Sequence, residues 1–199
     1  MRNLLYSMMV SLDGFIEDAR HSLDWVLIDR QLHQFVNDQQ AGTGAFLYGR
    51  RLYENMAAYW PTADQDPNAT DFSLEWQQIW KAMPKIVFSK TLEKVAWNSR
   101  LVRDDAVAEV RKLKAQAGKD LSMGGATLAG SLMKQDLIDE IQLFVMPVIL
   151  GSGTPFFPAL DHQIKLHLVE TRTFGSGAVF LRYQKEKSLA TDKGGNHRR

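Results

Sequence analysis

The sequence predicts an α/β fold, in which a mixed central sheet has helices on both faces and an antiparallel hairpin at its carboxyl-terminal end. Strand-like and helix-like segments alternate along most of the chain, which is typical of this class. Residues 3–10 are apolar at nearly every position, as in a strand buried on both faces. Residues 163–171 and 178–184 instead alternate between apolar and polar side chains across a glycine-rich turn, which indicates two antiparallel strands.

The segments between these strands are assigned from apolar periodicity and turn residues. The sequence SLDG at residues 11–14 ends the first strand, and residues 15–28 are expected to form an irregular loop. A helix at 29–40 follows, because Leu32 and Phe35 begin an apolar stripe on one helical face. In order, we then expect a strand at 45–48, a helix at 50–59, a polar loop at 61–71, a helix at 72–83, a strand at 85–89, a helix at 104–117, a strand at 120–123, a helix at 126–134 and a strand at 138–146.

Domain organisation follows from the absence of internal repeats and linkers. Residues 1–184 are predicted to form one domain, and the polar residues 185–199 are expected to form a flexible tail. The tail carries five Lys or Arg and two Asp or Glu, so the rest of the chain has a net charge of −2. A body of that charge lacks the basic surface of a nucleic-acid-binding protein.

Composition excludes several further classes of protein and site. The chain has no cysteine, which excludes disulfides, thiolate zinc sites and cysteine nucleophiles and is consistent with a cytoplasmic location. It has no run of about 18 apolar residues, so no membrane helix is expected. The five histidines show no metal-ligand spacing, so we expect no metal site.

Two predicted strand-to-helix junctions carry features of anion-binding sites. Gly49, Arg50 and Arg51 stand at the start of a helix, where free backbone amides and guanidinium groups favour phosphate. Gly124 and Gly125 form a tight turn before another helix, and glycine lets the backbone approach a pyrophosphate closely. Each junction alone also fits an ordinary helix start or turn. The turn does not match the GxGxxG pattern, which disfavours an ordinary Rossmann domain.

Two other strand ends could contribute to a ligand site. Ser89 and Lys90 follow a predicted strand, and a hydroxyl with an ammonium group there could hold a ribose 2′-phosphate or simply form a turn. Residues 147–153 run from a strand into a glycine-rich loop that could wall a flat ring. Asp13, in the SLDG turn, is the acid that we expect to supply a proton, although an aspartate there also suits an ordinary turn.

Taken together, these segments resemble the dihydrofolate-reductase-like superfamily, and in particular the C-terminal reductase domain of the riboflavin-biosynthesis protein RibD. The resemblance is carried, in chain order, by MMVSLDGFIED, LDWV, FLYGRRLYENMAAYWP, KIVFSKTL and LSMGGATLAGSLMKQDLIDEIQLFVMPVILGSGTPFF, and it covers roughly residues 2–184. It implies a dihydrofolate-reductase-like sheet and an NADPH-dependent reductase. Such a protein, similar to 5-amino-6-(5-phosphoribosylamino)uracil reductase, would transfer hydride to a C=N or C=O group of a pteridine- or aminopyrimidine-type substrate.

The resemblance also implies roles for particular residues and a homodimeric assembly. The implied cofactor-binding residues are Gly49, Arg50, Arg51, Tyr53, Ser89, Lys90, Gly124, Gly125, Ala126, Thr127 and Leu128. The implied substrate-binding residues are Asp13, Trp25, Pro147 and Gly151, and Asp13 is the expected catalytic residue.

Two other functions stay open at this point. Riboflavin-pathway reductases favour a basic residue directly after the SLDG turn, where this chain has Phe15. This difference concerns the substrate. Because no acid in the sequence is clearly catalytic, one alternative is a non-catalytic member of the same fold that binds a nucleotide or a flat heterocycle. The other is a structural protein that dimerises through residues 141–146 and 163–184.

Overall fold

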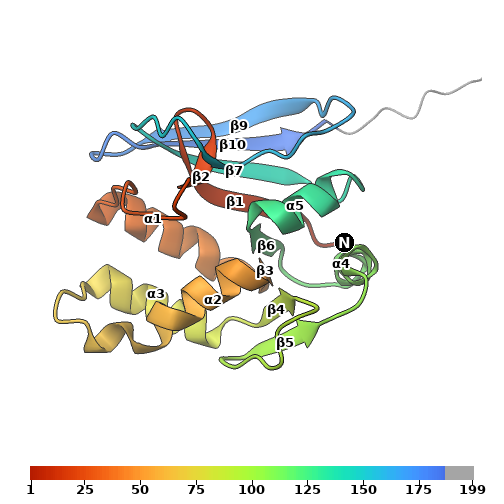
Figure 1. Cartoon of the computed structure of the whole chain (residues 1–199), viewed down its shortest axis with the longest axis horizontal. Coiled ribbons are helices and arrows are strands. Elements are labelled where there is room, and N and C mark those ends of the chain that lie inside the picture. Colours follow the sequence, from red (N-terminus) through yellow and green to blue (C-terminus); the bar gives the residue numbers. More distant parts are fainter. Residues whose placement is uncertain (187–199) are drawn as a thin grey trace, which may run out of the picture.

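The computed structural model describes residues 1–186, and eight of its strands form a central sheet in the order β5-β4-β3-β6-β1-β7-β10-β9 (Figure 1). The strands from β5 to β7 in this order are parallel to their neighbours, whereas β10 pairs antiparallel with both β7 and β9. The bounds are β1 Leu4–Ser11, β3 Ala45–Gly49, β4 Lys85–Phe88, β5 Ser99–Val102, β6 Leu121–Gly124, β7 Glu140–Met146, β9 Leu166–Thr173 and β10 Val179–Lys185. The sheet is therefore mixed, with the predicted antiparallel hairpin at one edge.

Helices cover both faces of this sheet, as predicted (Figure 1). In the described part of the chain they are α1 Arg30–Ala41, α2 Arg50–Tyr59, the 3-10 helix η1 Trp60–Gln65, α3 Asp71–Ala82, α4 Ala106–Ala115 and α5 Ala126–Met133. Side chains of β3 alternate between the faces: Leu47 packs in the core that includes α4 and α5, whereas Phe46 packs with Trp76 and Trp80 of α3. None of the helices within residues 1–186 is long and apolar enough to span a membrane.

Three short strands differ from the sequence-based expectation. β2 (Phe15–Asp18) lies in the segment expected to be an irregular loop, and it pairs antiparallel with β8 (Gly153–Pro155) as a separate two-stranded ribbon. β5 adds an edge strand beside β4. With only three or four residues each, these strands depend on their pairing partners rather than on a local apolar pattern. The expected loop at 15–28 is therefore wrong where β2 forms. The expected loop at 61–71 is likewise wrong where the 3-10 helix η1 forms.

The carboxyl-terminal end of the described chain follows the prediction closely. β10 ends at Lys185, one residue beyond the predicted strand. Most of the predicted tail, residues 187–199, lies outside the described residues.

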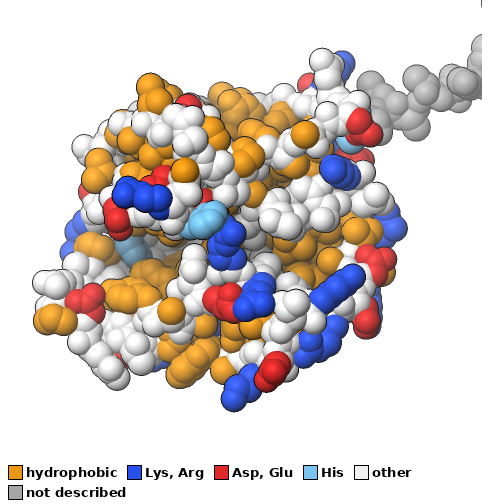
Figure 2. All heavy atoms as spheres, viewed as in Figure 1, with side chains coloured by type: hydrophobic (Ala, Val, Ile, Leu, Met, Phe, Trp, Pro, Cys, Tyr) orange, Lys and Arg blue, Asp and Glu red, His pale blue; other side chains and the backbone are white. Residues whose placement is uncertain are grey.

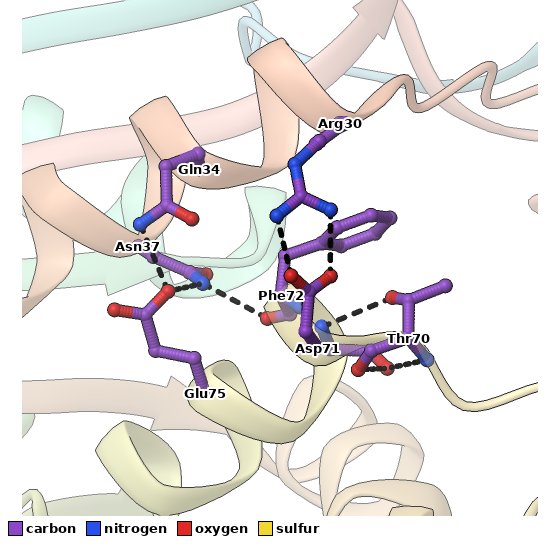
Figure 3. Close-up of polar contacts among 8 residues, drawn as sticks. Arg30, Gln34, Asn37, Thr70, Asp71, Phe72 and Glu75 are labelled. Atoms are coloured by element: carbon purple, nitrogen blue, oxygen red, sulfur yellow. Dashed lines mark hydrogen bonds and ion pairs between the residues drawn. The ribbon is translucent and has the colours of Figure 1, made fainter.

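A polar contact joins α1 to α3 on the face of the sheet that carries both helices (Figure 3). Arg30 of α1 donates from Nη1 and Nη2 to the two carboxylate oxygens of Asp71, with a distance of 2.8 Å between Nη1 and Oδ1. The buried Asn37 donates from Nδ2 to Glu75 Oε2 at 2.7 Å and to the carbonyl oxygen of Phe72 at 2.9 Å. Because a buried amide needs partners, these bonds fix α3 in one position along α1.

Candidate functional site

A cavity of about 750 Å³ lies at the carboxyl-terminal edge of the parallel strands. The ends of four neighbouring strands, β5, β4, β3 and β6, reach it, and Met8 within the adjacent β1 lines it as well; this is the edge where open α/β sheets bind ligands. Figure 2 shows Lys and Arg side chains gathered over α2 and the β4–β5 region. The lining includes Met8, Ile16, Glu17, Leu23, Gly49, Arg50, Arg51, Ser89, Lys90, Arg103, Gly125, Ala126, Thr127, Leu128 and Thr154.

The start of α2 brings backbone amides to this cavity. Gly49 is the N-cap residue, and no side chain caps the helix there. The first amides of α2 therefore stay available to a bound anion. A Cβ atom on Gly49 would meet its nearest neighbour, Leu128 Cβ, only at 3.9 Å, so glycine here leaves the helix end open rather than relieving a steric clash.

The start of α5 also lines the cavity, and the two glycines before it have different roles. Gly125 is the N-cap residue, again without a side-chain cap, and its φ of +94° lies in the region that favours glycine. Gly124 packs instead: a Cβ there would lie 2.5 Å from Leu52 Cδ2 and 2.9 Å from Met8 Sδ. Gly124 therefore lets α2 approach β6, while Gly125 exposes the amides that begin α5.

The ends of β4 and β5 add cations. Arg50 Nη1 donates to Thr91 Oγ1 at 2.8 Å, which joins the α2 start to the segment after β4. Ser89 Oγ accepts from the amides of Thr91 and Leu92 at 3.2 and 3.0 Å and shapes that turn. The ammonium group of Lys90 makes no hydrogen bond or ion pair with any residue among 1–186, so its charge is available to a ligand.

Sequence analysis did not single out Arg103, which follows β5 and also lines the cavity. Its guanidinium group donates to the carbonyl oxygen of Glu93 at 3.0 Å and to that of Lys90 at 3.4 Å. Because β5 itself was not expected, nothing in the sequence placed Arg103 at a strand end. The cations in this part of the cavity thus follow β3, β4 and β5, whereas only the ends of β3 and β4 were expected to supply them.

The opposite end of the cavity holds Glu17, a second residue that sequence analysis did not assign to the site. Its carboxylate belongs to β2 and is buried, and Oε1 accepts hydrogen bonds from Arg51 and from Thr154 of β8. His21 Nδ1 lies 2.9 Å from the same oxygen. Arg51 therefore lines the cavity but has its charge balanced by Glu17. In the sequence, Glu17 stands between Ile16 and Asp18, and no motif there marks it as a site residue.

Asp13 lies outside the cavity lining and braces two loops instead. Its carboxylate accepts from Ser11 Oγ at 2.7 Å, from the amide of Gly151 at 2.7 Å and from the amide of Leu150 at 3.1 Å. The Ser11 hydroxyl, together with these amides, holds the pKa of Asp13 below its usual range. The carboxylate thus ties the turn after β1 to the loop after β7.

The remaining sequence-predicted residues also lie apart from this lining. Trp25 packs on the core cluster around Phe144, with its Nε1 donating to the carbonyl oxygen of Ser22 at 3.1 Å. Pro147 is exposed and lies beside Gly177, where a Cβ would approach it to 3.3 Å. Tyr53 is buried in another cluster, and its hydroxyl accepts from the amide of Ala96 at 2.8 Å.

Acidic and histidine side chains do not gather into a metal site in the described part of the chain. Within residues 1–186, no three of them lie close enough together to hold an ion. The cavity presents backbone amides, guanidinium groups, an ammonium group, the buried carboxylate of Glu17 and the carboxylates of Glu54 and Asp104.

Two solved structures share this fold with little sequence identity. The alignment with a Shewanella sp. PV-4 protein named for riboflavin biosynthesis covers 94% of this chain and 100% of that protein, with a TM-score of 0.72 and 22% identity. The alignment with dihydrofolate reductase from Enterococcus faecalis, solved with NADP(H), covers 93% of this chain and 97% of that protein, with a TM-score of 0.60 and 15% identity. These likenesses confirm the predicted dihydrofolate-reductase-like fold.

Comparison at the level of sequence shows the family. Uncharacterized protein YyaP of Bacillus subtilis is 34% identical over 188 residues, which cover 92% of this chain and 94% of YyaP. The model of the RibD C-terminal domain family matches residues 2–180. The family and its structural neighbours include reductases. By this match over nearly the whole length, the chain belongs to the RibD C-terminal domain family, as its motifs predicted.

Proposed function

We propose that the protein is an NADPH-dependent reductase, with residues 1–184 acting as one domain. The observation that carries the proposal is the convergence of anion-binding features from several strand ends on one cavity. Gly49 and Arg50 after β3, Lys90 after β4 and Gly125 after β6 all line it. Three features that are individually ambiguous in the sequence therefore share one ligand-sized space.

The length of the cavity suits a dinucleotide better than a single nucleotide. Neighbouring strands lie about 4.8 Å apart, so the row of five strands from β5 to β1 that line the cavity extends over roughly 19 Å. The uncapped starts of α2 and α5 face the middle of this row and would hold the pyrophosphate. Lys90 and Arg103, at the β4–β5 end, would meet the additional phosphate on the adenosine ribose.

NADPH bound in this way would supply a hydride for a C=N or C=O carbon of a pteridine- or aminopyrimidine-type substrate. The contribution of the chain is to hold the cofactor, to orient it and to keep water from the reacting ring. Met8, Ile16 and Leu23 provide apolar surface at the β1 end of the cavity for that purpose. Asp13 serves in this proposal as a loop brace, because three donors already engage its carboxylate.

Cofactor binding provides the direct test. We expect NADPH to bind more tightly than NADH in a fluorescence titration. Lys90→Ala should weaken NADPH by about 1–2 kcal/mol, the value of a charge-assisted hydrogen bond, while leaving NADH unchanged. Lys94→Ala is a matched control, because Lys94 is exposed nearby but does not line the cavity. Equal affinity for NADPH and NADH would contradict the proposed role of Lys90.

Turnover separates the reductase from a non-catalytic binding protein of the same fold. Consumption of NADPH would be followed by its absorbance against a panel of pterins, aminopyrimidines and dicarbonyl compounds. Oxidation with any of them supports the reductase. Tight NADPH binding without turnover across the panel would favour the non-catalytic alternative.

We also propose that the protein forms a homodimer through the β10–β9 edge of the sheet. β9 is an edge strand, and its Leu168 and Val169 are 51% and 40% exposed. Exposed apolar side chains on an edge strand favour association with a second copy. Sedimentation equilibrium of the protein, compared with a Leu168→Lys variant, tests this assembly: a wild-type monomer would contradict it.

A further inference from the structure

Glu17 is a buried carboxylate whose two oxygens have different surroundings. Only 8% of its side chain is exposed. Oε1 accepts from Arg51 Nη1 and from Thr154 Oγ1, and His21 Nδ1 lies 2.9 Å from it. Oε2 accepts no hydrogen bond from any residue among 1–186. Because Glu17 lines the cavity, Oε2 is the oxygen that a ligand can reach.

The three groups around Oε1 come from three parts of the fold and hold the carboxylate in one orientation. Arg51 belongs to α2, Thr154 to β8 and His21 to the turn after β2. His21 has a φ of +63°, a conformation that non-glycine residues rarely adopt, which the amide hydrogen bonds to Asp18 in the same turn help to maintain. A side chain held so firmly on one oxygen keeps the other at a constant position.

Because Oε2 has no donor among residues 1–186 and is open to the cavity, a ligand that donates a hydrogen bond to it gains a charge-assisted contact in place of solvent. The complementary ligand group is an N–H or an O–H. A phosphate is excluded at this position, since it would bring a second negative charge next to Oε2.

The position of Glu17 along the cavity decides which part of a dinucleotide it meets. Lys90, whose charge has no partner in the described chain, lies at the β4 end and attracts the phosphorylated adenosine. Glu17 and Arg51 compensate each other at the β1 end, which suits the uncharged amide and ribose hydroxyls of the nicotinamide nucleoside. We propose that Glu17 Oε2 accepts a hydrogen bond from this nicotinamide-ribose half, an inference that rests on the proposed function.

Two variants of Glu17 separate this contact from a role in folding. In Glu17→Gln, the donors Arg51 and Thr154 hold the amide oxygen at the Oε1 position, so an NH₂ group replaces the acceptor at Oε2. Glu17→Asp keeps the charge but withdraws the carboxylate by one methylene. Thermal unfolding of both proteins establishes that each is folded before binding is compared.

The experiment measures dissociation constants of the full chain for two ligands, NADPH and adenosine 2′,5′-bisphosphate, which lacks the nicotinamide half. Both variants should weaken NADPH about tenfold or more, the effect of a hydrogen bond to a charged group. Adenosine 2′,5′-bisphosphate should change by less than about twofold, because its contacts are remote from Glu17. Glu109→Gln is the control for a lost charge, since Glu109 pairs with Arg100 outside the cavity.

Each result has a distinct meaning. Selective weakening of NADPH supports the contact. Equal weakening of both ligands would mean that Glu17 acts only by holding Arg51, and unchanged NADPH affinity would mean that Oε2 meets no donor; either result overturns the inference. A wild-type protein that fails to bind NADPH would instead contradict the proposed function, before any variant is compared.

Discussion

The helices of this fold begin in two different ways. Asp29, Thr70 and Asp105 cap α1, α3 and α4 with side-chain oxygens that accept from the first-turn amides. α2 and α5 begin instead at Gly49 and Gly125, with no side-chain cap. The starts of both glycine-capped helices line the cavity with uncapped amides, whereas α4, whose first residue Ala106 also reaches the cavity, has its start capped by Asp105.

This difference means that the start of a helix can favour either the stability of the helix or the binding of an anion. A side-chain cap satisfies amides that are otherwise without a partner and stabilises a helix by about 1 kcal/mol. Leaving a helix start uncapped forgoes that stabilisation but keeps its amides free for an anion. Substitutions at Gly49 and Thr70 test this interpretation, and one at Lys85 tests what stabilises the other end of a capped helix.

Gly49→Asp should have the largest effect. The backbone at Gly49 has ordinary extended dihedral angles, and a Cβ there would meet nothing closer than 3.9 Å, so aspartate fits and caps α2. We expect NADPH affinity to fall about a hundredfold, because the carboxylate occupies the amides and repels phosphate. Stability should be retained or rise by a few tenths of a kcal/mol. Fluorescence titration and urea denaturation measure the two effects.

Gly49→Ala is the matched control for that substitution. It adds a methyl group without a charge or a hydrogen-bond acceptor, so NADPH binding should weaken only a few-fold. If Gly49→Asp bound NADPH as tightly as the wild type, the α2 amides would have no part in binding.

Lys85→Met examines the other end of a capped helix. Lys85 is buried, and its ammonium group donates to the carbonyl oxygens of Trp80 and Met83 at the end of α3. Burial lowers its pKa to about 8 from 10.5, so the unfolded state holds more protons between these values and wild-type stability rises with pH across that window. Between pH 8 and pH 10, we expect the free energy of unfolding of the wild type to rise by about 1–2 kcal/mol relative to that of Lys85→Met. Urea denaturation at several pH values gives the difference; parallel pH profiles would contradict it.

Thr70→Ala should have the smallest effect on function. Thr70 Oγ1 accepts from the amide of Ser73 at 3.2 Å, and Ser73 Oγ accepts from the amide of Thr70 at 2.8 Å. Removing the threonine oxygen should lower the free energy of unfolding by about 1 kcal/mol. NADPH affinity should not change, because α3 begins away from the cavity. Thr70→Ser, which retains the acceptor, should remain close to the wild type in both measurements.

The elements that were predictable are those with a strong local pattern. The apolar run of β1 and the stripe of Leu32 and Phe35 in α1 carry enough signal in a single stretch of sequence. β2, β5 and β8 have three or four residues each, which is too short for a clear local pattern; β2 and β8 also pair across most of the chain, whereas β5 pairs with the nearby β4. Two cavity residues, Glu17 and Arg103, depend on these short strands and were missed with them.

Asp13 shows a second limit, which concerns direction rather than location. The SLDG motif placed this aspartate correctly at the end of β1. The groups that engage its carboxylate include the amides of Leu150 and Gly151, which lie more than a hundred positions later in the chain. No local pattern contains that information, so the sequence alone could not show that this aspartate joins two loops.

The central place of β1 in the sheet has a consequence for biosynthesis. Leu4 pairs with Leu121 of β6, and Leu5 pairs with Glu140 of β7, so both neighbours of the first strand are made long after it. During translation, the apolar sequence LLYSMMV therefore leaves the ribosome before its partner strands. It stays unpaired until more than half of the chain has been made. This nascent segment is where we expect a chaperone to engage the growing polypeptide.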